Sequence, residues 1–472
     1  MGVALQIGQA RAVLCRSLDA DVEASEGEQP MRHLRPLALV AALLTASVVV
    51  STAASAQTNP QKPTATEIGV TATTIRIAVV ADVDNSISPG IFAGSVAAVR
   101  GWAAYTNAHG GLAGRKVAVD FIDSHLSSSD ARNAVIQACS NDFALVGTSA
   151  VFLNDVSDIE SCVDHAGAAT GMPDLALVAT ELAQQCSPTT YAVNPSPIIC
   201  STQNDHPQTY QANMGRAFYY EAKYGKNLHG LYLLSGDLKS TENSNRASMN
   251  EMQTAGTGIK SDLETTISAA APQSAYTPIV LQLKQHNSTY AQSGSAVNTT
   301  VLLRKEAQLQ GLTDPNFIWD CTLQCYDQSL LAAGPVANGT YVSLLFLPFD
   351  EASSNPTLAN FLKYTGKDKA DGFGIQAYAS GLLLSQAINQ IVKTDGVNGV
   401  TRKAVFQQLS SITSFNAGGM IGTTNIAHQR VSPCYVLTRV ENGRFVRVTP
   451  TKQGTFDCNP RNVSQIKLDM SQ

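Results

Sequence analysis

Several strand-like apolar runs end in polar side chains that are suited to binding a small solute. In an open parallel sheet, ligands bind beyond the carboxyl ends of the strands, so residues that directly follow such runs are candidate contacts. Serine and threonine hydroxyls donate hydrogen bonds to a carboxylate, and an aspartate pairs with an ammonium group. The candidates of this kind are Asp82, Asp84, Thr148, Ser149, Thr180, Ser235, Asp237 and Asp320. This mixture suits a small polar or zwitterionic solute, although polar residues after strands also commonly cap the next helix.

The sequence carries no motif of a common catalytic site. It has no Gly-x-Ser-x-Gly elbow, no His-Glu-x-x-His, no Walker loop and no Gly-x-Gly-x-x-Gly after a strand. His125 and His165 are more consistent with surface or capping positions than with catalytic bases. A binding protein needs neither a nucleophile nor a base, so the sequence favours binding over catalysis and predicts no cofactor.

Charge gives little reason to expect a large charged partner. The net charge is −5, 15% of the residues are charged, and lysine and arginine form no cluster. Electrostatic attraction therefore favours neither nucleic acid nor an anionic membrane. At 472 residues, the chain is long enough for two or three domains with their own cores.

The N-terminal region has the order of a secretory signal. Met31, Arg32 and Arg35 form a short basic start, Leu37–Val50 is an apolar run, and Ala54-Ser55-Ala56 supplies small residues for cleavage. We expect a signal peptide from Met31 to Ala56, with Met31 as the true start. No cysteine closely follows the run to carry a lipid anchor, so the product is expected in the periplasm or outside the cell.

The cysteines agree with an exported protein. Of the nine, only Cys15 precedes the predicted cleavage site. The remaining eight form four close sequence pairs, which predict the disulfides Cys139–Cys162, Cys186–Cys200, Cys321–Cys325 and Cys434–Cys458. Eight cysteines allow 105 connectivities, so this pairing rests on proximity in the chain. Cys321-x-x-x-Cys325 has a zinc-like spacing, but no further Cys or His cluster completes four ligands.

Strand and helix patterns alternate along most of the chain. The predicted strands are Ile75–Val80, Val117–Ile122, Phe143–Val146, Leu175–Val178, Leu231–Leu234, Phe317–Trp319 and Tyr341–Leu347. The predicted helices are Ile91–Tyr105, Ser157–Ala169, Tyr210–Tyr224, Ile279–Gln285, Val301–Leu309, Phe373–Val392 and Thr401–Leu409. Asn442-Gly443 predicts a final hairpin between Tyr435–Val440 and Phe445–Val448. This alternation predicts an α/β fold of parallel sheets flanked by helices.

A turn after the first predicted helix carries a family resemblance. Its matching residues are Asn107, Gly110, Gly111, Gly114, Arg115 and Lys116. The segment Ile75–Asp123 closely resembles the opening of periplasmic substrate-binding proteins of the branched-chain amino acid (Leu/Ile/Val) transporter family. There, a strand, a polar loop and a helix lead into an Asn-x-x-Gly-Gly-x-x-Gly-Arg/Asn-Lys turn. The resemblance covers Thr74 to about Val448 and implies a two-lobed type I periplasmic binding fold with three interlobe crossings.

The resemblance also implies a binding site. In the family, the segments matching Ser149-Ala150-Val151 and Val178-Ala179-Thr180 bind the solute carboxylate, and an acid at or beside Asp320 binds the amine. Phe92 or Ile91 stands where an aromatic residue often covers the ligand. The implied contacts are Asp84, Phe92, Thr148, Ser149, Val151, Ala179, Thr180, Asp237 and Asp320.

This sequence departs from the family at three places in that site. Ala150-Val151 replaces a Ser-Ser pair, Lys239-Ser240 replaces an aromatic-glycine pair after Asp237, and Cys321 stands at one of the two positions that match the family's acid. The solute is therefore open among amino acids, amides and related compounds.

The crossings divide the chain into predicted parts. We place them near Asn194–Pro197, Phe346–Phe349 and Gly418–Thr423. The resulting parts are 1–56 (upstream extension and signal peptide), 57–73 (flexible leader), 74–195 (first lobe), 196–346 (second lobe), 347–418 (first lobe again) and 419–472 (second lobe, with the hairpin and tail).

The expected function is an exported, monomeric solute-binding protein that delivers a small polar solute to the membrane subunits of an ABC importer. The alternatives are an extracellular ligand-sensing domain of the same fold and a secreted enzyme.

Overall fold

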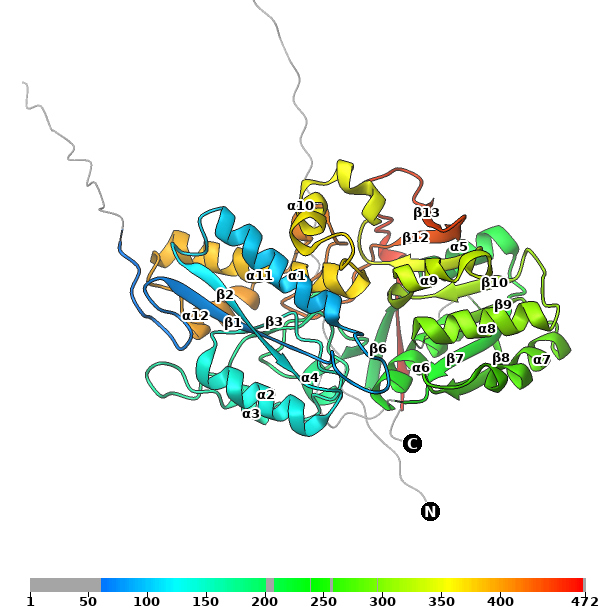
Figure 1. Ribbon diagram of the computed structural model, residues 1–472, viewed down its shortest axis with the longest axis horizontal. Helices are drawn as coiled ribbons and strands as arrows, with labels where there is room; N and C mark the ends of the chain where they lie inside the picture. The colour runs from blue at the N-terminus through cyan, green and yellow to red at the C-terminus, as the bar shows by residue number, and fades with distance from the viewer. Residues whose placement is uncertain (1–60, 201–207, 238, 255–257, 295, 470–472) are drawn as a thin grey trace, which may run out of the picture. The chain divides into compact units, whose positions relative to one another are not determined.

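The computed structural model describes residues 61–200, 208–237, 239–254, 258–294 and 296–469 (Figure 1). The predicted signal peptide lies outside these ranges. Within them, no helix combines the length and the apolar character needed to cross a membrane.

A four-stranded parallel sheet forms the first half of the fold. Its order is β2-β1-β3-β4, from β1 (Thr74–Ala81), β2 (Lys116–Asp123), β3 (Leu145–Val146) and β4 (Asp174–Leu175). In Figure 1, α1 (Ala93–Ala108) and α11 (Gly372–Asp395) lie on one side of these strands, and α2 (Ser128–Asn141) and α3 (Ser157–Glu160) lie on the other. Successive side chains of β1 point to opposite faces, so Val79 packs beneath α1 and α11 while Val80 packs beneath α2. Both faces are therefore apolar, as the sequence pattern predicts.

A seven-stranded sheet forms the second half, in the order β13-β12-β11-β10-β9-β7-β8. Its parallel strands are β7 (His229–Ser235), β8 (Lys260–Ile267), β9 (Tyr290–Ser293), β10 (Ile318–Cys321) and β11 (Thr340–Leu344). The hairpin β12 (Val436–Glu441) and β13 (Arg444–Thr449) adds two antiparallel strands. One face packs against α5 (Gly215–Tyr224) and α6 (Lys239–Thr254), and the other against α7 (Thr277–Gln285) and α8 (Val297–Leu309).

Shorter elements complete the described chain. The remaining α-helices are α4 (Leu182–Gln185), α9 (Gln328–Ala332), α10 (Pro356–Thr365) and α12 (Arg402–Leu409). The 3-10 turns are Gln273–Tyr276, Leu323–Cys325, Gly334–Ala337, Phe349–Ser354, Ala417–Gly419 and Pro460–Asn462.

A third, small sheet was not predicted. It joins β5 (Ile198–Ile199), β6 (Gln208–Asn213) and β14 (Val463–Leu468) in antiparallel pairs. The predicted helix Tyr210–Tyr224 is wrong in its first part, because residues 208–213 pair along their whole length with β14. Pairing with a distant segment overrides the local preference here.

The predicted helix Ser157–Ala169 is also too long. The helix ends at Glu160, where the chain turns. Asp164 accepts hydrogen bonds from the amides of Ala166 and Ala168 through Oδ1, and Val163 pairs with Ala169. An aspartate that bonds nearby backbone amides stabilises a turn in place of a helix.

The family-like turn is held by two side chains. The Asn107 amide donates to the Val117 carbonyl at 2.8 Å and accepts from its N–H at 2.7 Å. The Arg115 guanidinium is buried and donates to backbone carbonyls of Thr64, Thr71, Ala113 and Val397. Gly111 has φ +79°, and an added Cβ would lie 2.0 Å from the Arg115 carbonyl oxygen. These residues therefore build the fold and are not solute contacts.

The described part of the predicted leader is hydrogen-bonded to the segment after α11 and to Arg115 of this turn. The Asn398 side chain donates to the Lys62 carbonyl, and Thr66 Oγ1 donates to the Val400 carbonyl at 2.6 Å. With the Arg115 bond to Thr64, these contacts argue against a flexible segment from Lys62 onward.

Residues within or directly beside all three predicted crossings line one small pocket. It has a volume of about 10 Å³, and its lining includes Asn194, Pro195, Leu345, Ile421 and Gly422. The second and third crossings also run side by side, because the Leu347 amide donates to the Met420 carbonyl and the Gly422 amide to the Leu345 carbonyl. The boundaries between lobes remain a prediction that this convergence supports.

All four predicted disulfides are present. Cys139 bonds to Cys162, Cys186 to Cys200, Cys321 to Cys325 and Cys434 to Cys458. Pairing of neighbours along the chain was therefore the correct choice among the possible connectivities.

Candidate functional site

The carboxylate of Asp82 organises the edge of the first sheet where its strands end. Asp82 follows β1 and is fully buried. Its Oδ1 accepts from the Ser124 hydroxyl at 2.6 Å and the Leu126 amide at 2.8 Å, and its Oδ2 accepts from the Val151 amide at 2.7 Å. One buried side chain thus ties together the loops that follow β1, β2 and β3.

Thr148 belongs to a second buried network. Its hydroxyl donates to Asp174 Oδ1 at 2.6 Å, and Gln184 and Thr190 donate to Oδ2. Burial raises the pKa of Asp174, and the three donors act in the opposite direction. The Thr148 hydroxyl therefore already has a partner within the protein.

The structure brings five of the predicted first-lobe residues together. The Thr180 hydroxyl donates to the Val151 carbonyl at 2.8 Å, and the Leu177 amide donates to the Thr148 carbonyl. Ser149 and Ala179 lie in the same two loops, each 3% exposed. Thr148, Ser149, Val151, Ala179 and Thr180 thus form one cluster beyond β3 and β4.

Three polar atoms near this edge have no partner among the described residues. They are Ser95 Oγ, Ser149 Oγ and Gln376 Oε1, and each belongs to a residue at least nine-tenths buried. A buried polar group without a hydrogen bond is costly and usually marks a missing partner such as water or a ligand.

Helix packing brings the segments that carry these three residues to the same end of the first sheet. A Cβ at Gly147 would touch Val99 of α1 and Ala377 of α11. Ser95 lies one turn before Val99, Gln376 is next to Ala377, and Ser149 is two residues beyond Gly147. Ser95 and Gln376 are not among the contacts predicted from the sequence, although each is a polar residue within the apolar face of a helix.

Asp84 and Phe92 lie on either side of the loop that enters α1. Asp84 is exposed, and its amide donates to Asp123 Oδ2 at 3.0 Å. Phe92 is 4% exposed and packs edge-on against Phe373, with ring centroids 4.8 Å apart. Phe92 is therefore mainly a core residue in this structure.

Asp371 is a further acid beside α1 that the sequence analysis missed. It caps α11 by accepting the Gly374 amide at 2.6 Å, and a Cβ at Gly94 would lie 2.0 Å from its Oδ2. Burial raises the pKa of Asp371 to about 6. An aspartate directly before Gly-Phe-Gly was the sequence signal for this cap.

Asp320 lies inside the second half of the fold. Its carboxylate accepts from Arg216 Nε at 3.0 Å, from the Tyr220 hydroxyl at 2.7 Å and from the Tyr290 hydroxyl at 2.6 Å. Trp319 faces α7 and α8, so the alternation along β10 turns Asp320 towards α5. Burial, followed by the charge of Asp320, raises the pKa of both tyrosines well above the ordinary value. The tyrosines therefore act as donors to this carboxylate.

Asp237 lies apart from Asp320, just beyond β7. Its Oδ2 accepts the Ala269 amide at 2.6 Å, and its side chain is partly exposed. The structure thus does not bring the two predicted second-lobe acids together.

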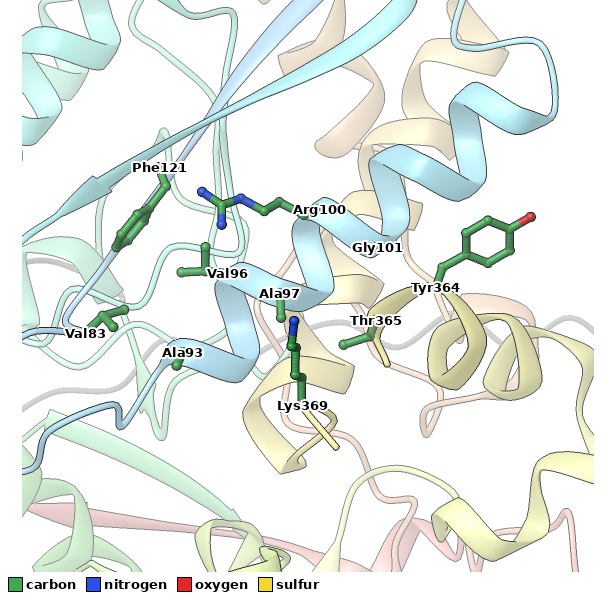
Figure 2. Close-up of a pocket in the computed structure, with 10 residues that line it drawn as sticks. All are labelled: Val83, Ala93, Val96, Ala97, Arg100, Gly101, Phe121, Tyr364, Thr365 and Lys369. Carbon is green, nitrogen blue, oxygen red and sulfur yellow. The ribbon is translucent and has the colours of Figure 1, made fainter. Parts of the chain in front are cut away.

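A pocket on the first half of the fold contains none of the predicted contacts. Figure 2 shows this pocket, of about 430 Å³, along α1 with Phe121 on one side and α10 on the other. The Arg100 guanidinium lies over the Phe121 ring, 5.8 Å from its centroid. In the described part of the chain, no group of three or more His, Cys, Asp or Glu is placed to hold a metal ion.

Solved structures share this fold at low sequence identity. A fatty acid ABC transporter substrate-binding protein from Thermomonospora curvata is 15% identical, with a TM-score of 0.61 over 82% of this chain and 97% of its own. A leucine binding protein from Thermotoga maritima is 17% identical, with a TM-score of 0.60 over 79% and 98%. An extracellular ligand-binding receptor from Rhodopseudomonas palustris HaA2 is 14% identical, with a TM-score of 0.60 over 80% and 100%. These likenesses show the type I periplasmic binding protein fold.

Comparison with curated proteins found no match. The family model for periplasmic binding proteins, in contrast, matches residues 74–444, which is most of the chain. This is a family of binding proteins and not of enzymes, in agreement with the sequence prediction. The chain belongs to the periplasmic binding protein family.

Proposed function

We propose that this protein captures a small polar solute between two lobes and delivers it to the membrane subunits of an ABC importer. The family match supports a binding role, and the strand ends of the first sheet supply the residues. The observation that carries the proposal is the set of unpartnered polar atoms on Ser95, Ser149 and Gln376 at that edge. A solute with hydrogen-bonding groups would supply the missing partners, directly or through water.

Asp82 narrows the class of solute. The Val151 amide N–H donates its hydrogen bond to the Asp82 carboxylate, so it is not free to bind a solute carboxylate. Among the described residues, Asp82 forms no ion pair, and its negative charge repels an anion. The solute group that faces the first sheet is therefore neutral or cationic, as in an amide, a urea or an amine.

Most of the proposed contacts are among those expected from the sequence. Ser149, Val151, Ala179 and Thr180 form the seat on the first sheet, with Ser95 and Gln376 added from the helices. Asp84 and Asp237 stand as exposed or partly exposed acids at the rim, and the Phe92 ring is an apolar neighbour. Thr148 and Asp320 are left out, because internal partners occupy their polar atoms.

A thermal-shift screen of the purified protein tests this function. The panel contains neutral amides and ureas, amines, zwitterionic amino acids and simple carboxylates. A bound solute stabilises the native state by about 2.7 kcal/mol at a hundredfold excess over Kd. We expect a saturable rise in Tm with a neutral or cationic member. A rise with carboxylates alone would contradict the proposed class, and turnover of any member would contradict a binding function.

A further inference from the structure

We propose that a pocket where strands β10 and β11 of the second sheet begin binds a small oxyanion between Arg304 and Arg439. The oxyanion is a phosphate or a carboxylate. The pocket has a volume of about 280 Å³ and is lined by residues that precede β10 and β11, including Asp314, Phe317 and Asn338. It therefore lies at the amino ends of these strands, whereas the proposed solute site lies at carboxyl ends. This second site does not depend on the proposed function.

Arg304 is held rigidly in this pocket. From α8, its Nη1 donates to Thr340 Oγ1 at 2.6 Å and its Nη2 to the Asn338 carbonyl at 2.7 Å. The guanidinium lies over the Trp319 ring, 5.0 Å from the centroid. A guanidinium has five N–H donors in a fixed planar fork, so further donors remain for a ligand.

The charge of Arg304 lacks an internal counterion. No acid of the described chain forms an ion pair with it. Burial, with a smaller contribution from Arg439, lowers its pKa to about 9, so it remains charged at neutral pH. Arg304 is partly buried, and a partly buried charge without an acidic partner makes an anion from solution the expected partner.

Arg439 supplies the second cation from β12. Its Nε is buried and has no hydrogen-bond partner among the described residues. Its Nη1 lies 3.6 Å from Glu441 Oε1, so the nearest acid makes a long ion pair only. Two guanidiniums that line one pocket repel each other, and an oxyanion between them would satisfy both.

The rest of the lining limits what fits. Asp314 is the acid in the pocket wall, and its Oδ1 accepts the Asn316 amide at 2.8 Å within its own turn. Leu312, Phe317 and Trp319 make part of the wall apolar. The site thus suits a compact anion, free or attached to a small apolar group.

Titration calorimetry at low ionic strength, with inorganic phosphate and with acetate, tests this site. The variants are Arg304→Gln and Arg439→Gln, and Lys305→Gln is the matched control, because it removes the same charge from an exposed neighbour on α8. We expect at least one anion to bind, with at least tenfold weaker binding in both arginine variants and unchanged binding in the control.

Each outcome of this titration either supports or overturns the proposed anion site. Phosphate binding without acetate binding supports the site and indicates a tetrahedral dianion, and the reverse result supports it and indicates a carboxylate. Binding of neither anion overturns the proposal, as does binding that persists in both arginine variants. If Arg304→Gln does not fold, Arg439→Gln decides alone, because its side chain is 31% exposed.

Discussion

The backbone amide of Val151 donates a 2.7 Å hydrogen bond to the buried carboxylate of Asp82. The resemblance to branched-chain amino acid-binding proteins places the carboxylate-binding segment of the family at this position. Here the Val151 amide is already hydrogen-bonded to the carboxylate of Asp82. The Val151 amide is therefore not free to bind a solute carboxylate.

Asp82→Asn should lower the free energy of unfolding by about 1–3 kcal/mol. The carboxylate accepts three hydrogen bonds in a buried site. The asparagine carboxamide has only one acceptor oxygen, and its NH2 group would face a hydrogen-bond donor of the protein. Urea denaturation measures the difference. Asp84→Asn is the control, because it removes the same charge from an exposed side chain and should change stability little. Equal effects of the two variants would contradict this role of Asp82.

Asp320→Asn should destabilise the protein and leave solute affinity unchanged. Its carboxylate pairs with Arg216 and accepts bonds from Tyr220 and Tyr290 in the core. Removing one partner of a buried ion pair costs about 3–5 kcal/mol. Chemical denaturation and calorimetry on the same variant separate the two effects. A variant with wild-type stability that no longer binds the solute would contradict this prediction and show that Asp320 contacts the solute.

Glu251→Gln should make the protein more stable at pH 8 and leave it nearly unchanged at pH 4. Glu251 lies on α6, fully buried, where Ser464 donates to Oε2 and Oε1 has no partner among the described residues. Burial raises the pKa of Glu251 from 4.5 to about 7. The free energy of unfolding is therefore highest below about pH 4.5 and falls as the pH rises to about 7. The unfolded state loses its proton first, and the folded state must then bury a charge.

Urea denaturation from pH 4 to pH 8 measures this difference. The free energy of unfolding of the glutamine variant should exceed that of the wild type increasingly as the pH rises. Parallel pH profiles for the two proteins would show that Glu251 does not titrate in this range.

Loss of the Cys139–Cys162 disulfide should cost more than loss of Cys321–Cys325. The sequence separations are 23 and 4 residues. In the chain-entropy model, loops of these lengths contribute about 3 and about 2 kcal/mol. Denaturation of the two double Cys→Ser variants compares them, after peptide mapping without reduction has established the pairs. Eight free thiols in the exported protein would contradict the pairing.

The parts of the fold that could be predicted are those with local signals. The apolar run Ile75–Val80 and the glycines after α1 predict the first strand–helix–strand unit, and Asn442-Gly443 predicts the hairpin. Strand β6 had no such signal, because its partner β14 lies far along the chain. Pairing between distant segments depends on the assembled fold and cannot be inferred from a window of sequence.

The grouping of the candidate residues was predictable, but the hydrogen-bond partners of their side chains were not. The strand ends predicted that Ser149, Val151 and Thr180 lie close together, and the Thr180–Val151 hydrogen bond shows that two of them do. The sequence does not show that Asp82 occupies the Val151 amide, or that alternation along β10 turns Asp320 into the core. Both facts depend on which neighbours packing brings within hydrogen-bonding distance.

Calorimetric titration of Ser149→Ala with the solute that the screen identifies tests the central claim most directly. The Ser149 hydroxyl has no partner within the described protein, so removing it should leave the Tm unchanged. Loss of one hydrogen bond to the solute should weaken binding by about 1 kcal/mol, roughly fivefold. Ser161→Ala, an exposed serine, is the control and should bind like the wild type. Weaker binding by Ser149→Ala alone, at unchanged Tm, is the predicted result; equal affinity of both variants and the wild type would contradict a solute site at this edge.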